Sequence, residues 1–147
     1  MNYPFVESDA GRSLSRRPKQ SNDCTVRALS LVTSVPYDTV YDLLAAEGRK
    51  CGRGFQFKNF VRRSGVISQS VPGEILGHSV DKFYFPGKRG ERRMNPFTFA
   101  RTKPFNEGRW IVKVAKHVFA FIDGTAYDMC PEPDDRCIYT AFRFVKK

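Results

Sequence analysis

The 147-residue sequence contains no long hydrophobic run. A membrane-spanning helix needs about 20 consecutive apolar residues, and no stretch of this sequence approaches that length. The first five residues, MNYPF, also have neither the basic start nor the apolar run of a secretion signal. We therefore expect a cytoplasmic protein that has no membrane partner.

Histidine is scarce, and the cysteines are not spaced for metal binding. The histidines are His78 and His117 alone, and no two cysteines form a Cys-x-x-Cys pair. A zinc site would lack its usual ligands, so we expect no metal and no other cofactor. A chain of this size can form a core without disulfides, so the sequence favours free thiols over a bridge between Cys130 and Cys137. The four cysteines are Cys24, Cys51, Cys130 and Cys137.

Acidic side chains are outnumbered by basic ones, 15 against 25, which gives a formal net charge of +10. Such a surface attracts nucleic acid or acidic proteins. Basic and aromatic residues alternate in the middle of the chain, a mixture that can contact phosphates and stack on bases. No named nucleic-acid motif is present, so a solvated basic loop over buried aromatics is the alternative. The candidate polyanion-binding residues are Lys88, Arg89, Arg92 and Arg93.

Few apolar residues occur near the amino terminus. Residues 1–19 are expected to form a surface or partly mobile basic arm, which leaves residues 20–147 as a single domain. Apolar spacing then predicts three helices, with Asn22 or Asp23 as the N-cap of the first. These helices cover residues 24–33, 38–47 and 55–63.

The carboxyl-terminal third has the alternation and turn signals of β-strands. Residues 66–103 are rich in glycine and proline and predict loops with one or two short strands. Four later runs predict an antiparallel meander, and helices followed by a sheet indicate an α+β fold. These four strands cover residues 110–114, 117–122, 126–129 and 138–145.

An Asp-Gly pair separates two of these strands and predicts a tight hairpin. If Asp123 and Gly124 form a two-residue turn, Phe119 lies opposite Asp128, and His117 becomes a diagonal neighbour of Asp128 on the same face. A carboxylate and an imidazole can close the resulting gap of about 7 Å between the backbones. One more loop residue would slip the register and turn Asp128 to the other face.

One cysteine has a setting that suits chemistry. Cys24 begins the first predicted helix, where backbone N–H groups and the helix dipole stabilise a thiolate. A thiolate nucleophile needs an imidazole partner, and that imidazole needs a third group to orient it. His117 and Asp128 are the candidates. The alternatives are plain helix packing for Cys24, an ordinary strand-end histidine for His117 and a solvated hairpin residue for Asp128. Cys51, which has basic neighbours, is a lower-ranked alternative nucleophile. His78 is expected in a loop.

The sequence resembles the papain-like cysteine peptidase superfamily at both ends. The resemblance is carried by residues 19–29 (KQSNDCTVRAL), residues 117–124 (HVFAFIDG) and the Tyr127-Asp128 pair. Within that superfamily, the compact size and the run Asn22-Asp23-Cys24 resemble small peptidase-like proteins of bacteria and their phages, including relatives of bacteriocin-processing peptidases. The resemblance implies a papain-like α+β fold in which a helix starting at the cysteine packs on an antiparallel sheet. Residues 49–108 resemble no family that we can name.

The resemblance also implies roles for individual residues. Cys24 would be the nucleophile, His117 the general base and later the acid, and Asp128 the orienting carboxylate. The Gln20 amide and the Cys24 backbone N–H would form the oxyanion hole, although familiar members place this glutamine further upstream. Asn22 is therefore an alternative oxyanion donor.

The expected activity is that of a cysteine hydrolase. The resemblance implies a peptidase or isopeptidase that cleaves a protein or peptide substrate through an acyl-thioester on Cys24. The same triad also serves acyl transferases. The alternative is a non-catalytic binding module, or a phage effector working in the host cytoplasm, whose basic surface engages nucleic acid or an acidic partner protein.

Overall fold

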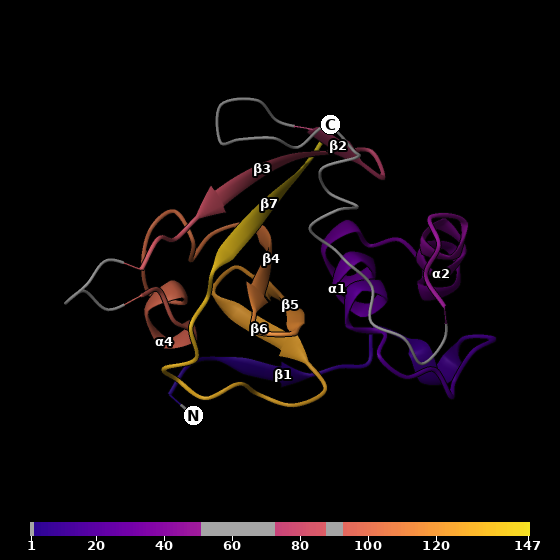
Figure 1. Ribbon diagram of the computed structural model, residues 1–147, viewed down its shortest axis with the longest axis horizontal. Coiled ribbons are helices and arrows are strands. Elements are labelled where there is room, and N and C mark those ends of the chain that lie inside the picture. The colour runs from indigo at the N-terminus through magenta and orange to yellow at the C-terminus, as the bar shows by residue number, and fades with distance from the viewer. Residues whose placement is uncertain (1, 51–72, 88–92) are drawn as a thin grey trace.

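The computed structural model describes residues 2–50, 73–87 and 93–147. Within these residues the fold is mixed α/β, with three α-helices and a seven-stranded sheet (Figure 1). The helices are α1 (Cys24–Thr33), α2 (Tyr37–Ala46) and α4 (Pro96–Phe99), and a 3-10 turn covers Arg12–Leu14. The strands are β1 (Phe5–Glu7), β2 (Gly73–Ile75), β3 (His78–Tyr84), β4 (Arg109–Val114), β5 (His117–Ile122), β6 (Thr125–Asp128) and β7 (Thr140–Lys146). The helix predicted over residues 55–63 lies outside the described residues.

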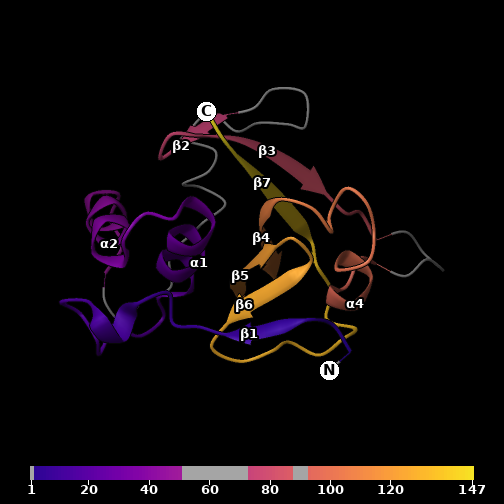
Figure 2. The ribbon, with the colours of Figure 1, turned by 180° about the vertical axis from the view of Figure 1, so that it is seen from behind.

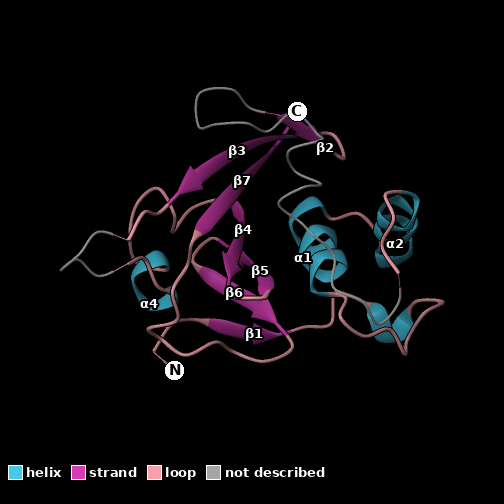
Figure 3. Ribbon diagram, in the orientation of Figure 1, coloured by secondary structure: helices cyan, strands magenta, loops and turns pink. Residues whose placement is uncertain are grey.

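The sheet runs in the order β1-β6-β5-β4-β7-β3-β2, and all its strand pairs are antiparallel except β1 with β6. The helices α1 and α2 lie on one side of the sheet and α4 lies on the other (Figure 3). The amino terminus lies by β1 and the carboxyl terminus by β2, at opposite edges of the sheet (Figure 2).

Each face of the sheet has its own hydrophobic core, because alternate residues of a strand point to opposite faces. On one face, α1 contributes Val26, Leu29 and Val32, all fully buried, to a core that includes Val118 and Ala120 of β5. The other face is aromatic and is made by the side chains of Tyr3, Phe99, Trp110, Phe119 and Phe121.

The first helix begins and ends where the sequence predicted, at residues 24 and 33. Its apolar residues recur at helical spacing, and Ser34 follows in the left-handed conformation at φ 58°, which ends the helix. The second helix starts at Tyr37, one residue earlier than predicted. Asp23 occupies the N-cap position of α1, but its side chain makes no capping hydrogen bond, so the predicted capping role of Asp23 is wrong.

The hairpin between β5 and β6 has the predicted register. Ile122 lies opposite Thr125, and the two-residue turn between them consists of Asp123 at φ 49° and Gly124 at φ 79°. Positive φ at both central residues is the property of a type I′ turn, for which Asp-Gly is a preferred sequence. The Asp123 carboxylate belongs to the turn, since its Oδ1 accepts a hydrogen bond from the Gly108 N–H at 2.8 Å.

The expected four-strand meander is wrong in its last strand. The strands β4, β5 and β6 do form a meander, but β7 pairs with β4 and β3 and not with β6. The chain after β6 returns across the sheet, and buried Ile138 anchors it through its N–H bond to Met94 O at 2.9 Å. The middle of the chain, predicted as loops with one or two short strands, contains the three-residue β2, the seven-residue β3 and the short helix α4, which was not predicted.

The amino-terminal segment is part of the sheet, so the fold does not begin near Gln20. Strand β1 pairs with β6 in parallel, with Glu7 opposite Asp128. Tyr3 is buried, and its hydroxyl donates a hydrogen bond to Glu132 O at 2.5 Å. A run of three strand residues is too short to show a periodicity, and its partner strand is more than a hundred residues away in sequence. Among the described residues, no helix has the length and apolar character needed to cross a membrane.

Candidate active site

Cys24 is the first residue of α1 and lies partly buried at the helix amino terminus. Burial raises the pKa of its thiol, but a hydrogen bond from His117, a backbone hydrogen bond at Val118 and the positive charges of His117 and Arg27 lower it. The resulting pKa of Cys24 is below the ordinary value for cysteine. The thiolate is therefore more populated near neutral pH than that of an ordinary cysteine.

His117 opens β5 and lies between Cys24 and Asp128. Its Nε2 is 2.6 Å from Asp128 Oδ2, so Nε2–H donates to the carboxylate and Nδ1 is the ring nitrogen left for the thiol. The imidazole stacks on Phe119, two residues along the same strand face, with ring centroids 5.9 Å apart. Burial lowers the pKa of His117, but the hydrogen bonds and charges of Asp128 and Cys24 raise it to about 9.

Asp128 is the last residue of β6 and is only 4% exposed. Its Oδ2 accepts from His117, and its Oδ1 accepts from Arg27 Nη1 at 2.6 Å and from the Met129 N–H at 2.8 Å. Burial raises the pKa of Asp128, but these hydrogen bonds and the charge of His117 hold it below its usual range. The carboxylate therefore stays ionised despite being buried.

Together these three groups shift the protonation balance towards a thiolate on Cys24 and an imidazolium on His117. The lowered pKa of Cys24 and the raised pKa of His117 both increase the population of this ion pair. Asp128 fixes the tautomer and the ring orientation of His117 and stabilises its positive charge. This arrangement can deliver a nucleophilic sulfur and then a proton to one reacting group.

An open cavity of about 220 Å³ adjoins the imidazole. It gives His117 and Asp128 access to a molecule from solution. The residues that line it are Arg27, His117, Asp128, Met129, Cys130, Pro131 and Glu132.

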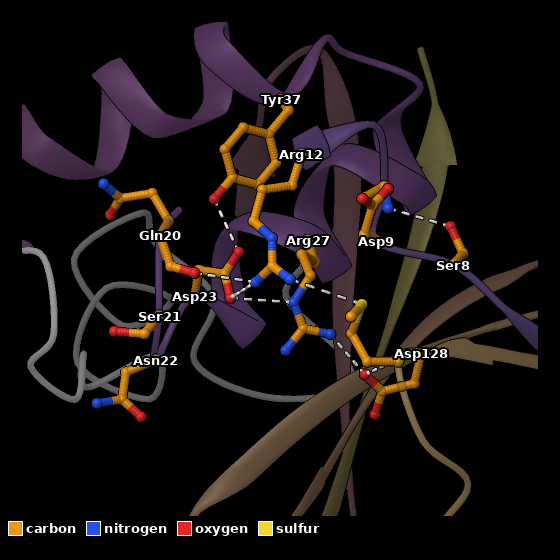
Figure 4. Close-up of polar contacts among 12 residues, drawn as sticks. Ser8, Asp9, Arg12, Gln20, Ser21, Asn22, Asp23, Arg27, Tyr37 and Asp128 are labelled. Atoms are coloured by element: carbon orange, nitrogen blue, oxygen red, sulfur yellow. Dashed lines mark hydrogen bonds and ion pairs between the residues drawn. The ribbon is translucent and has the colours of Figure 1, made fainter. Parts of the chain in front are cut away.

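A second group of charged residues surrounds Asp23, immediately before the cysteine (Figure 4). The Asp23 side chain is 2% exposed, and its Oδ2 accepts a hydrogen bond from the Tyr37 hydroxyl at 2.7 Å. Its Oδ1 accepts from Arg12 Nη1 and from Arg27 Nε, each at 3.1 Å. These contacts explain why Asp23 does not cap α1, because both of its carboxylate oxygens already have partners.

Sequence reasoning missed the three residues that contact Asp23. The spacing of Asp23 and Arg27 is the i, i+4 spacing of an ion pair on a helix, which was the one local signal available. Neither Arg12 nor Tyr37 shows a sequence pattern that points to Asp23. The contact between Arg27 and Asp128 joins residues 101 positions apart and depends on how α1 packs on the sheet.

The two predicted oxyanion donors, Gln20 and Asn22, come directly before α1. The Gln20 amide oxygen lies 3.5 Å from Arg49 Nη1, and the amide groups of Gln20 and Asn22 both point away from Asp128 (Figure 4). The part of the predicted oxyanion hole that the fold does place at the helix start is the Cys24 backbone N–H. The roles of Gln20 and Asn22 stay predictions.

Of the other residues singled out in the sequence, Cys130 lines the cavity beside His117. His78 is buried in β3 and not in a loop, and its Nδ1 lies 2.9 Å from Leu76 O. Cys130 and Cys137 are free, exposed thiols and form no bridge. The Arg93 guanidinium lies 4.9 Å from the centroid of the Tyr139 ring. Cys51, Lys88, Arg89 and Arg92 lie outside the described residues.

Comparison with protein-family models, with curated proteins and with solved structures found no match to this chain. Its function is therefore argued from the residues and their geometry.

Proposed function

We propose that this protein is a papain-like cysteine hydrolase that cleaves amide bonds through an acyl-thioester on Cys24. The observation that carries the proposal is the contact of 2.6 Å between His117 Nε2 and Asp128 Oδ2, beside a cysteine whose pKa is lowered by that same histidine. Three residues from a helix start and from two adjacent strands are thereby brought to one place.

The arrangement supports a two-stage reaction. The Cys24 thiolate attacks the carbonyl carbon of an amide, and the His117 imidazolium gives its proton to the departing amine as the C–N bond breaks. The neutral His117 then takes a proton from water, whose oxygen attacks the thioester and releases the acid and the Cys24 thiolate. The protonated His117 that results restores the starting ion pair. An amine in place of water would give acyl transfer by the same steps.

The fold is consistent with this assignment. The nucleophile stands at the amino terminus of a helix packed against the sheet, and the histidine and aspartate follow on adjacent antiparallel strands, which is the papain-like order. We propose an amide of a protein or peptide as the substrate, cleaved by peptidase or isopeptidase action.

The test is the pH dependence of iodoacetamide alkylation at each cysteine, followed by mass spectrometry. Cys130 and Cys137 are exposed and serve as reference thiols within the same molecule, and Cys137 is the reference for His117→Ala because Cys130 lines the cavity beside His117. Cys24 should react faster than both at about pH 6, because its thiolate persists to lower pH. His117→Ala should remove this difference in alkylation rate between Cys24 and the reference thiols.

The matched control is His78→Gln, which changes the other histidine of the chain and should leave the Cys24 profile unaltered. The proposal is wrong if Cys24 in the wild type has the same pH profile as the reference thiols, or if His117→Ala leaves its reactivity unchanged.

A further inference from the structure

Arg27 contacts two buried carboxylates, Asp23 and Asp128, the second of which belongs to the candidate site. Its side chain is 11% exposed, its Nη1 lies 2.6 Å from Asp128 Oδ1, and its Nε lies 3.1 Å from Asp23 Oδ1. Because a guanidinium is planar and rigid, these two contacts fix both the position and the plane of the Arg27 group.

Arg27 and His117 share Asp128 between them, one on each carboxylate oxygen. Arg27 bonds Oδ1, where the Met129 N–H also donates, and His117 bonds Oδ2. Rotating the carboxylate away from His117 would break a charge-assisted hydrogen bond to Arg27 in a buried environment, where such bonds are strong. The bond to Arg27 therefore favours the one orientation in which Oδ2 faces the imidazole.

Arg27 is itself held by Asp23, and Asp23 is held from two other elements. Arg12 in the 3-10 turn donates to Asp23 Oδ1, and Tyr37 at the start of α2 donates to Asp23 Oδ2. The second guanidinium nitrogen of Arg12, Nη2, reaches Met129 Sδ at 3.9 Å, next to Asp128. The end of β6 and the start of α1 are thus connected through one contiguous set of buried charges (Figure 4).

This connection has a direct geometric consequence for the nucleophile. Arg27 lies three residues after Cys24, on the first turn of the same helix, while Asp128 belongs to the sheet. The bond between Arg27 and Asp128 therefore ties the helix that carries the thiol to the strand that carries the carboxylate. The contacts that run from Cys24 through His117 and Asp128 to Arg27 thus lead back to the helix that carries Cys24.

From these contacts we infer that Arg27 is a positioning residue for the reaction of Cys24, which it supports by fixing the Asp128 carboxylate against His117. The inference rests on the proposed function, since it gives Arg27 a part in activating the same thiol. Asp23 supports Arg27 and has no direct role in the reaction.

Arg27→Gln tests this inference, with Arg109→Gln as the matched control. Arg109 also ties α1 to the sheet, at the opposite end of the helix, where its Nη1 donates to Val32 O at 3.1 Å and to Ser34 Oγ at 2.7 Å. Both variants lose one positive charge and one bridge between α1 and the sheet. Arg27→Gln removes a partner of Asp128, and it also removes a positive charge that itself lowers the pKa of Cys24, a charge that Arg27→Lys retains.

The readout is the rate of Cys24 alkylation as a function of pH. Arg27→Gln should lower the rate at about pH 6 by about tenfold, which corresponds to a shift of one unit in the pKa of Cys24. Arg109→Gln should leave the profile as in the wild type. An unchanged profile in Arg27→Gln, or an equal shift in both variants, overturns the inference.

Arg27→Lys covers the case in which Arg27→Gln does not fold, as judged by circular dichroism. Lysine keeps the charge but cannot donate to both carboxylates from a rigid plane, so its loss of reactivity should be smaller than that of Arg27→Gln but measurable. A folded Arg27→Lys protein with the wild-type profile overturns the inference.

A double-mutant cycle shows whether Arg27 acts through Asp128. In the Asp128→Asn background, Arg27→Gln should change the Cys24 profile far less than in the wild type. An equal change in both backgrounds contradicts the inference. The His117→Ala result separates the two proposals: if it abolishes the low-pH reactivity while Arg27→Gln does not alter it, the hydrolase proposal stands and the role of Arg27 is wrong. If His117→Ala changes nothing, both fail.

Discussion

His117 Nε2 and Asp128 Oδ2 lie 2.6 Å apart across the hairpin of β5 and β6. The contact follows from the strand register, because a two-residue turn at Asp123 and Gly124 brings His117 and Asp128 to the same face. It also follows from burial, which leaves the carboxylate few polar partners besides His117, Arg27 and the Met129 N–H. Because Asp128 contacts the imidazole directly, it should set the pKa of His117.

Asp128→Asn should lower the pKa of His117 from about 9 towards the ordinary value for histidine. The neutral amide removes both the charge and the acceptor that stabilise the imidazolium. Because the imidazolium then loses its proton at a lower pH, the upper pH limit of the range in which the thiolate and the imidazolium coexist should fall. An NMR titration of the His117 ring protons measures this shift.

Asp123→Asn is the control for this substitution, since Asp123 lies in the same hairpin. Its carboxylate bonds the Gly108 N–H and belongs to the turn, so the pKa of His117 should not change. An equal decrease in both variants would mean that general charge and not the specific contact sets the pKa of His117.

The elements that the sequence predicted well are those whose signals are local. The bounds of α1 follow from apolar residues at helical spacing up to the Ser34 end, and the hairpin follows from the Asp-Gly pair. Because the hairpin fixes its own register, the proximity of His117 and Asp128 could also be derived before any tertiary structure was known.

The elements that the sequence did not reveal depend on partners distant in the chain. The pairing of Phe5–Glu7 with β6 and the placement of β7 beside β3 are decided by which sheet edges the packed core leaves open. The bond between Arg27 and Asp128 likewise depends on the angle at which α1 packs on the sheet. A residue pattern within one segment carries no information on such contacts.

Gly124→Ala should destabilise the hairpin more than Gly11→Ala destabilises the amino-terminal turn. Both glycines have positive φ, which costs alanine about 1 kcal/mol or more. A Cβ at Gly124 would in addition lie 3.2 Å from Ala100 O, whereas a Cβ at Gly11 would meet nothing within 4 Å. Chemical denaturation of the two variants measures the difference. An equal loss in both would show that backbone strain alone determines the cost.

Tyr3→Ala should destabilise the fold by about 3 kcal/mol, the usual cost of truncating a buried aromatic residue. Tyr3 is 4% exposed, its ring centroid lies 6.1 Å from that of Phe121, and its hydroxyl bonds Glu132 O. Leu14→Ala is the control, since Leu14 is 93% exposed and its truncation should leave the unfolding free energy unchanged. If Tyr3→Ala has no more effect than Leu14→Ala, the amino-terminal segment behaves as the surface arm that its composition suggested.

The raised pKa of His117 also makes the stability of the fold depend on pH, and a Cys24→Ala background isolates this dependence from the titration of the thiol. Asp128 still binds the imidazolium in that background, so the folded protein holds the His117 proton more tightly than the unfolded chain does. The stabilisation is complete below the unfolded pKa of about 6.5 and is lost as the pH rises towards the folded value, which lies at or below about 9. The free energy of unfolding of Cys24→Ala should therefore fall over this range, by at most about 1.4 kcal/mol per pH unit. Asp128 itself adds no slope there, because its pKa is lowered and its contribution changes only in acid.

Denaturation curves of Cys24→Ala, compared with those of Cys24→Ala combined with His117→Phe, measure the effect, and the double variant should lack this slope. A parallel pH dependence in the two proteins would show that His117 is not protonated more readily in the folded state.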